Sequence, residues 1–147
     1  QNEVQSLQRL AGELHIQERV SFLGPVAQEG LPLLYSAADI CVIPSYYESF
    51  GMVALESLAC GTPVVATDVG GMRCIIRHGE MGRIVGDNSP HNLASEMAEL
   101  LSRREDQTQY VETRRSMIAE FSWVNIADMM LREYSRVFRD YPARVNL

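Results

Sequence analysis

The sequence contains no lysine, little positive charge and no long apolar run. All 13 basic side chains of its 147 residues are arginine, against 19 acidic side chains, and the formal net charge is −6. An acidic chain without a basic patch is not expected to bind nucleic acid. No apolar run approaches the roughly 20 residues of a membrane span, and no signal peptide opens the chain, so membrane contact is not indicated. Without lysine, this chain cannot itself form the Schiff base that a pyridoxal phosphate enzyme needs.

Cysteine is also scarce. Cys41, Cys60 and Cys74 lack metal-ligand spacing and lie in apolar segments, which predicts small core residues in a reducing, cytoplasmic compartment. No Asp-x-Asp motif is present either, so no metal site is expected. With 46% apolar residues, the chain can bury a sizeable core. We expect one domain over residues 1–140, followed by a frayed tail at 141–147.

The stretch 44–71, PSYYESFGMVALESLACGTPVVATDVGG, organises the chain. The apolar run at 40–43 predicts a buried strand, and the apolar spacing over 50–59 is mostly helical. Gly61 is placed to end that helix because it tolerates positive φ, and residues 63–66 predict a second buried strand. A unit of strand, loop, helix and strand is typical of parallel sheets.

Two glutamates, Glu48 and Glu56, are the sharpest chemical feature of this unit. Glu48 lies in the loop before the helix, and Glu56 lies roughly 9 Å along from Phe50 at 1.5 Å per residue. Between them are helix-start amides that lack intrahelical partners and carry the positive end of the dipole, and Gly51 permits close approach to the backbone. The pattern fits an anion at the helix start with a hydroxyl-rich group on either side. Two surface glutamates on an ordinary helix are the alternative, and spacing alone somewhat favours it.

The string ESFGMVALE at 48–56, followed by ACGTPVV at 59–65 and Gly70-Gly71, resembles the retaining glycosyltransferases of family four. The resemblance extends from VSFLG at 20–24 to Ser122-Trp123 and the last helix. It implies the GT-B fold, in which two Rossmann-like domains face a cleft. The expected fold class is therefore α/β: a Rossmann-like parallel sheet with flanking helices, forming part of a C-terminal GT-B domain.

The resemblance also implies roles for individual residues. Glu48 is similar to the catalytic carboxylate that binds hydroxyls of the donor sugar, and Glu56 to the one that accepts both ribose hydroxyls. The amides of Gly51, Met52 and Val53 would meet the diphosphate and the edge of the sugar, as a helix start is suited to do.

Two further residues complete the expected donor site. Phe50 precedes Gly51 in the matching string, and Val26 lies where the family places the nucleobase, although Val26 could equally only close a turn. Gly70-Gly71 is interpreted as a strand-to-helix turn in preference to a ligand contact. Tyr46, Tyr47 and Arg73 are left as packing or surface residues.

By this resemblance the reaction moves a sugar from a nucleotide-diphosphate sugar, such as a UDP- or GDP-sugar, to an acceptor hydroxyl with retained configuration. No cofactor is expected. The acceptor domain and a basic pair that stabilises the leaving diphosphate lie in a missing N-terminal part of the enzyme, so the isolated chain is predicted to be inactive. The alternatives are a nucleotide-sugar epimerase of the same fold and a non-catalytic fragment.

Elsewhere, apolar spacing predicts helices over 4–14, 31–37, 90–101, 111–121 and 123–138, a short helix after Gly71, and strands at 19–24 and 82–85. The last helix is expected to pack through Ile126, Met130, Tyr134, Val137 and Phe138.

The family's strand order, 3-2-1-4-5-6, assigns residues 20–23, 40–43, 64–66 and 83–85 to strands 3, 4, 5 and 6. Strands 1 and 2 would be absent, and each unpaired ladder group of a buried strand costs roughly 1–3 kcal/mol. We therefore expect self-association of this chain through open sheet edges, or a rearranged sheet.

Overall fold

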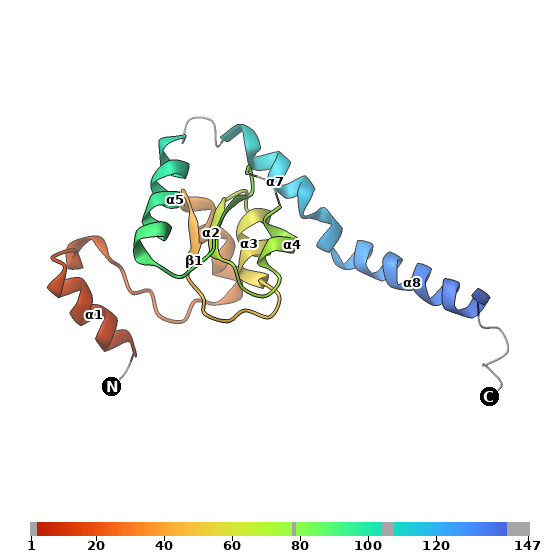
Figure 1. The fold of residues 1–147 in the computed structure, drawn as a ribbon, viewed down its shortest axis with the longest axis horizontal. Helices are drawn as coiled ribbons and strands as arrows, with labels where there is room; N and C mark the ends of the chain where they lie inside the picture. The colour runs from red at the N-terminus through yellow and green to blue at the C-terminus, as the bar shows by residue number, and fades with distance from the viewer. Residues whose placement is uncertain (1–2, 78, 104–107, 141–147) are drawn as a thin grey trace. The chain divides into compact units, whose positions relative to one another are not determined.

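The computed structural model describes residues 3–77, 79–103 and 108–140, and the expected tail at 141–147 lies outside them. The chain divides into two compact units, Gln1–Leu31 and Pro32–Leu147, which are described separately. Figure 1 gives the order of the elements along the chain.

The first unit contains helix α1, Glu3–Glu13, and two short 3-10 helices, η1 at Gln17–Arg19 and η2 at Gln28–Gly30. Helix α1 ends in a double cap: the His15 amide donates to the Gly12 carbonyl, and the Ile16 amide donates to the Ala11 carbonyl, both at 3.0 Å. His15 makes this possible with a φ of 56°, the left-handed conformation typical of such caps. His15 is thus a capping residue of α1.

The strand predicted at 19–24 is wrong. Residues 17–19 form η1, and Val20 follows with extended dihedrals, but no described strand pairs with the segment. An extended segment becomes a strand only when a neighbour accepts and donates its ladder hydrogen bonds. The apolar pattern at 20–23 therefore predicted the backbone conformation without the partner it requires.

The second unit is built on a parallel sheet in the order β1-β2-β3, with strands at Cys41–Ile43, Val64–Thr67 and Gly82–Val85. In register, Val42 lies opposite Val65, and Ala66 lies opposite Ile84. This confirms the predicted neighbours 4-5-6 of the family's strand order. Among the described strands β1 pairs on one side only, and self-association through that edge stays a prediction.

The helices of this unit are α2 (Leu31–Ala37), α3 (Met52–Ala59), α4 (Met72–Ile75), α5 (Pro90–Ser102), α7 (Val111–Met117) and α8 (Trp123–Asp140), with short turns η3 (Thr108–Tyr110) and η4 (Ala119–Phe121). The predicted end of α3 at Gly61 is confirmed. Gly61 follows α3 with a φ of 88°, and the Ser89 side chain caps α5 by accepting from the Asn92 amide at 3.2 Å.

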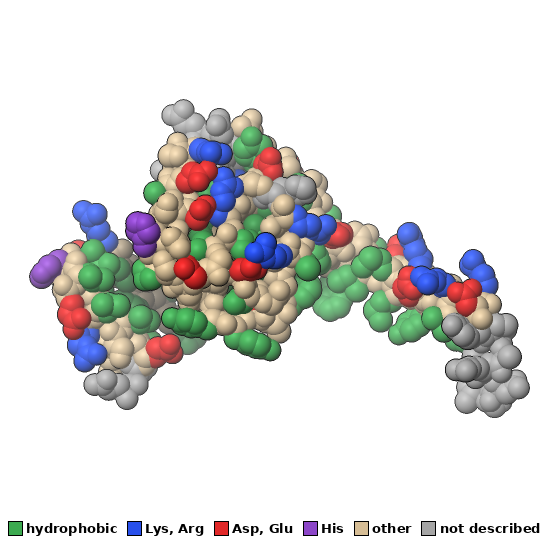
Figure 2. Space-filling model, viewed as in Figure 1, with side chains coloured by type: hydrophobic (Ala, Val, Ile, Leu, Met, Phe, Trp, Pro, Cys, Tyr) green, Lys and Arg blue, Asp and Glu red, His purple; other side chains and the backbone are tan. Residues whose placement is uncertain are grey.

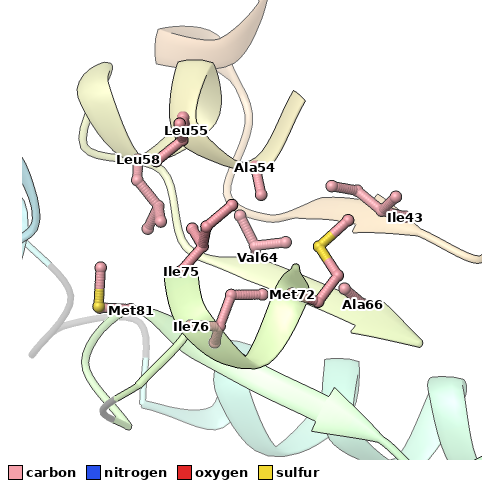
Figure 3. Close-up of a cluster of buried hydrophobic side chains, with 10 residues drawn as sticks. All are labelled: Ile43, Ala54, Leu55, Leu58, Val64, Ala66, Met72, Ile75, Ile76 and Met81. Carbon is pink, nitrogen blue, oxygen red and sulfur yellow. The ribbon is translucent and has the colours of Figure 1, made fainter. Parts of the chain in front are cut away.

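Side chains of the central strand alternate between two cores. Val64 and Ala66 face α3 and α4, in the cluster that Figure 3 shows around Leu58, Met72 and Ile75. Val65 points to the other face, where it packs with Leu93 of α5. Helices on both faces bury the sheet, which explains why all of Val64–Thr67 is buried.

Two packing predictions are wrong. Cys41 packs against the core and Cys60 is half-buried, but Cys74 is exposed on α4. The expected stripe on α8, represented by Met130, Tyr134 and Phe138, is exposed, and no residue of α8 is buried. Figure 2 shows hydrophobic side chains along one side of α8 and charged ones along the other. The pattern predicted the amphipathic helix correctly, but no described residue covers its apolar face.

Candidate functional site

The chemistry-bearing residues gather where β1 and β2 end. Loop 44–51 leaves the carboxyl end of β1 and leads into α3, and residues 68–71 leave the carboxyl end of β2 and lead into α4. In open parallel sheets this edge is where ligands bind.

Side chains from neighbouring segments fix the start of loop 44–51. The Thr67 hydroxyl, at the end of β2, donates to the Ser45 carbonyl at 2.5 Å. The Asn88 side-chain amide donates to the Pro44 carbonyl at 2.7 Å. The loop therefore leaves β1 in a conformation set by side chains that follow the other two strands.

Two glycines bring the second loop against the first. A Cβ at Gly70, which has a φ of 53°, would lie 1.7 Å from the Glu48 carbonyl oxygen, and one at Gly71 would lie 2.6 Å from the Phe50 carbonyl oxygen. The pair forms the turn between β2 and α4, which confirms the strand-to-helix interpretation. Close backbone contact, as well as left-handed geometry at Gly70, requires glycine here.

Glu48 organises the entrance to α3. Its Oε1 accepts hydrogen bonds from the amides of Phe50 and Gly51, each at 3.2 Å. Gly51 itself is buried with a φ of 100°, and a Cβ there would lie 2.9 Å from Ile75 Cδ1. The carboxylate thus holds the loop in the shape that starts the helix.

The backbone amides of the next two residues, Met52 and Val53, differ from those of Phe50 and Gly51. Those of Met52 and Val53 have no acceptor among the described residues, as expected for the first turn of a helix. Both residues are exposed, Met52 at 56% and Val53 at 41%. Two donors at the positive end of α3 are therefore open to an anion beside the Glu48 carboxylate.

Glu56 lies one turn further along α3 and is half-buried. Its Oε2 accepts a hydrogen bond from the Tyr35 hydroxyl of α2 at 3.0 Å. Burial, followed by this hydrogen bond, raises the pKa of Tyr35 to about 12, so the phenol stays protonated and remains a donor at neutral pH. Sequence reasoning missed Tyr35, because the apolar spacing of 31–37 accounts for the helix without it.

Phe50 contacts the segment before α8. Its ring meets that of Phe121 edge-on, with centroids 6.0 Å apart, and the Arg77 guanidinium lies 5.8 Å from the centroid of Phe121. Arg77 also forms an ion pair with Glu120. Aromatic and charged contacts from η4 thus support the residue that precedes Gly51.

The remaining sequence candidates differ in placement. Val26 lies in the first unit, which is described separately from the unit that holds Glu48 and Glu56, so its role stays a prediction. Tyr46 and Tyr47 are 88% and 84% exposed on loop 44–51. Arg73 forms a two-pronged pair with Asp68, with Nε 2.7 Å from Oδ1.

Arg114 of α7 is the second residue that sequence reasoning missed. It is buried, and it donates to the Glu80 carbonyl through Nε at 2.5 Å and to the Gly61 carbonyl through Nη1 at 2.9 Å. Burial lowers the pKa of the guanidinium, yet arginine remains charged. The adjacent Arg115 gives the segment the appearance of a charged surface helix, so no sequence signal marks Arg114.

A pocket of about 260 Å³ lies at the opposite edge of the sheet, where residues lead into β1 and β2. It is lined in part by Asp39, Thr62, Pro63 and Arg114. None of the site residues at the carboxyl edge contributes to it. The described residues also include no group of three or more His, Cys, Asp or Glu side chains placed to hold a metal ion, and none of their helices is long and apolar enough to cross a membrane.

Comparison with known protein families decides the classification. The model of the family described as glycosyl transferases group 1 matches residues 1–117. The chain belongs to this family. The resemblance carried by ESFGMVALE is thereby confirmed, and loop 44–51 with the start of α3 lies within the matched region of this group 1 domain.

Curated relatives of this group 1 chain include two D-inositol 3-phosphate glycosyltransferases. That of Mycolicibacterium smegmatis is 42% identical over 139 residues, covering 95% of this chain and 32% of the relative. That of Mycobacterium leprae is 40% identical over 139 residues, covering 93% of this chain and 32% of the relative. The chain therefore spans about a third of the length of these relatives.

Solved structures agree on the fold. A sucrose-phosphate synthase from Thermosynechococcus elongatus superposes with a TM-score of 0.81 at 36% identity, covering 92% of this chain and 34% of that one. Anabaena HepE, solved in complex with UDP, superposes with a TM-score of 0.81 at 27% identity, covering 90% and 36%. The α/β GT-B assignment is confirmed for this group 1 domain.

Proposed function

We propose that this chain is the donor-binding part of a longer retaining glycosyltransferase, in which it binds a nucleotide-diphosphate sugar. The observation that carries the proposal is the start of α3, where the open amides of Met52 and Val53 lie between the carboxylates of Glu48 and Glu56. Met52 and Glu56 are separated by about 6 Å of helix rise. An anion at the amides would thus leave hydroxyl groups on either side within reach of a carboxylate.

The roles follow the charges. The diphosphate accepts hydrogen bonds from the amides of Met52 and Val53 at the positive end of α3. These donors and the helix dipole stabilise its negative charge as a leaving group. Glu56 accepts the ribose hydroxyls, and Glu48 directs its second oxygen to hydroxyls of the donor sugar. Phe50 and Gly51 shape the wall between them, and a role for Val26 at the nucleobase stays a prediction from the family resemblance.

The finer properties belong to the same proposal. Transfer retains the anomeric configuration, uses no metal ion, and requires an N-terminal part that supplies the acceptor site and further positive charge for the diphosphate. The relatives are about three times as long as this chain, which supports such a division. Because the structural neighbour HepE was solved with UDP, UDP is the first nucleotide to test.

An epimerase of the same fold is the second candidate, because it would bind a similar donor. Incubation of the full-length protein with a radiolabelled nucleotide sugar and a panel of acceptors separates the two. Label moved to an acceptor supports the transferase, whereas an isomerised nucleotide sugar supports the epimerase.

The Glu56→Ala variant of the full-length protein is expected to bind the nucleotide diphosphate about 1–3 kcal/mol more weakly, because the ribose hydroxyls lose a charged acceptor. Isothermal titration calorimetry with UDP and GDP measures the change. Glu133→Ala serves as the control, since Glu133 is 70% exposed on α8. Unchanged affinity in Glu56→Ala would contradict the ribose assignment.

Glu48→Gln is expected to reduce turnover about 10- to 100-fold while changing nucleotide diphosphate affinity less than about threefold. Glutamine keeps an oxygen that can accept from Phe50 and Gly51, so the loop retains its shape and only the charge near the sugar is lost. Steady-state kinetics and calorimetry give the two quantities. Glu48→Ala, which loses the loop acceptor as well, should reduce both. Equal losses of affinity and turnover in Glu48→Gln would assign Glu48 to the nucleotide.

A further inference from the structure

The Glu56 carboxylate of α3 is hydrogen-bonded to a side chain of a second helix, α2. Its Oε2 receives the Tyr35 hydroxyl at 3.0 Å, across 21 residues of sequence. Among the described residues this is the carboxylate's single hydrogen bond. Both side chains are half-buried, so water does not fully screen the contact.

Tyr35 is itself fixed at its backbone. The buried Thr62 hydroxyl donates to the Tyr35 carbonyl at 2.6 Å. The Ser57 hydroxyl of α3 in turn donates to the Thr62 carbonyl at 3.1 Å. Helix α2 is therefore tied to the turn after α3, and the phenol approaches Glu56 from an anchored position.

A glutamate on a helix normally rotates about three side-chain bonds and loses that freedom when a ligand engages it. Tyr35 occupies only one of the roughly four acceptor positions of the carboxylate, which leaves the whole of Oε1 and part of Oε2 for a ligand. A carboxylate that is ordered before binding gives a higher affinity, because less side-chain conformational entropy is then lost when the ligand binds.

We infer that Tyr35 is a positioning residue for nucleotide binding: its hydroxyl orients Glu56 so that the carboxylate meets the ribose hydroxyls of the donor. The inference rests on the proposed function and assigns it a residue from α2, outside the matching glutamate string. The raised pKa of Tyr35 keeps the phenol a donor throughout the pH range of an assay.

The test is Tyr35→Phe in the full-length protein, with calorimetric affinities for UDP and GDP and for their 2′,3′-dideoxy forms, which lack both ribose hydroxyls. Phenylalanine keeps the ring and loses the hydroxyl. The affinity for the ribonucleotide is expected to fall about three- to tenfold and that for the 2′,3′-dideoxynucleotide less than about twofold. In a Glu56→Ala background, which removes the acceptor of the Tyr35 hydroxyl, the Tyr35→Phe change should add no further loss, because the two residues act as one unit. Tyr134→Phe on α8 is the matched control and should change neither affinity.

Four results would overturn the inference. Tyr35→Phe could leave ribonucleotide affinity unchanged while Glu56→Ala weakens it, in which case the proposed function stands without Tyr35. An equal loss for ribo- and dideoxynucleotides would indicate a general structural role, as would a loss that persists in the Glu56→Ala background. If the unmodified protein binds neither UDP nor GDP, the proposed function fails and the inference fails with it.

Discussion

The Gly70→Ala variant of the full-length enzyme is expected to transfer sugar about 100-fold more slowly than the unmodified enzyme. The added Cβ would lie 1.7 Å from the Glu48 carbonyl oxygen, so one of the two loops must move by more than 1 Å. Alanine also resists the φ of 53° at this position. The Glu48 carboxylate, which accepts from the amides of Phe50 and Gly51 just before α3, would move with its backbone, and displacements of about 1 Å cost roughly this much in rate.

A graded set of alanines separates loop displacement from a general effect of removing glycine. At Gly71 the Cβ would lie 2.6 Å from the Phe50 carbonyl oxygen, and at Gly86 it would meet nothing within 4 Å. Turnover should therefore fall most in Gly70→Ala, less in Gly71→Ala and hardly at all in Gly86→Ala. Circular dichroism and melting temperature establish that each variant is folded. Normal turnover in a folded Gly70→Ala would show that the contact with Glu48 does not set the site.

The sequence predicts well those features that depend on local pattern. The run at 40–43, the helix over 52–59 and the strand at 64–67 follow one another in the chain, and strands joined through a helix in this way pair as parallel neighbours. Gly61 ends α3 through its backbone conformation, and Ser89 begins α5 through its side chain. Both roles depend on the residue type itself and can therefore be predicted from the sequence.

What the sequence predicted less well depends on partners far along the chain. The segment at 20–23 has strand composition, but pairing requires a neighbour. The α8 stripe has helical periodicity, but burial requires a surface against it. Tyr35 meets Glu56 only because the turn after α3 returns the chain past α2. Hydrophobic periodicity describes a single helix or strand, whereas each of these contacts joins two elements that lie apart in the sequence.

Arg114 is the clearest example of a residue whose role depends on distant parts of the chain. Its replacement is expected to destabilise this domain severely. Arg114→Ala should lower the local unfolding free energy by about 3–5 kcal/mol, because one buried and one half-buried carbonyl lose a charged donor and the side chain leaves a cavity. Those carbonyls belong to Gly61, in the turn before β2, and Glu80, in the turn before β3. One guanidinium therefore links α7 to the turns that lead into two strands of the sheet.

Hydrogen exchange of peptides spanning β2 and β3 in the full-length protein measures this change domain by domain. Arg115→Ala is the matched control: Arg115 pairs with Glu112 and donates to the Ala59 carbonyl, but it is 46% exposed, so its loss should cost less than about 1 kcal/mol. Arg114→Lys should fall between the two, because lysine keeps the charge without the planar fork that reaches both carbonyls. If exchange in β2 and β3 rises no more in Arg114→Ala than in Arg115→Ala, the two turns hold their conformation without the guanidinium, and the stability of the sheet edge near them must come from the apolar cluster around Leu58 and Met81 alone.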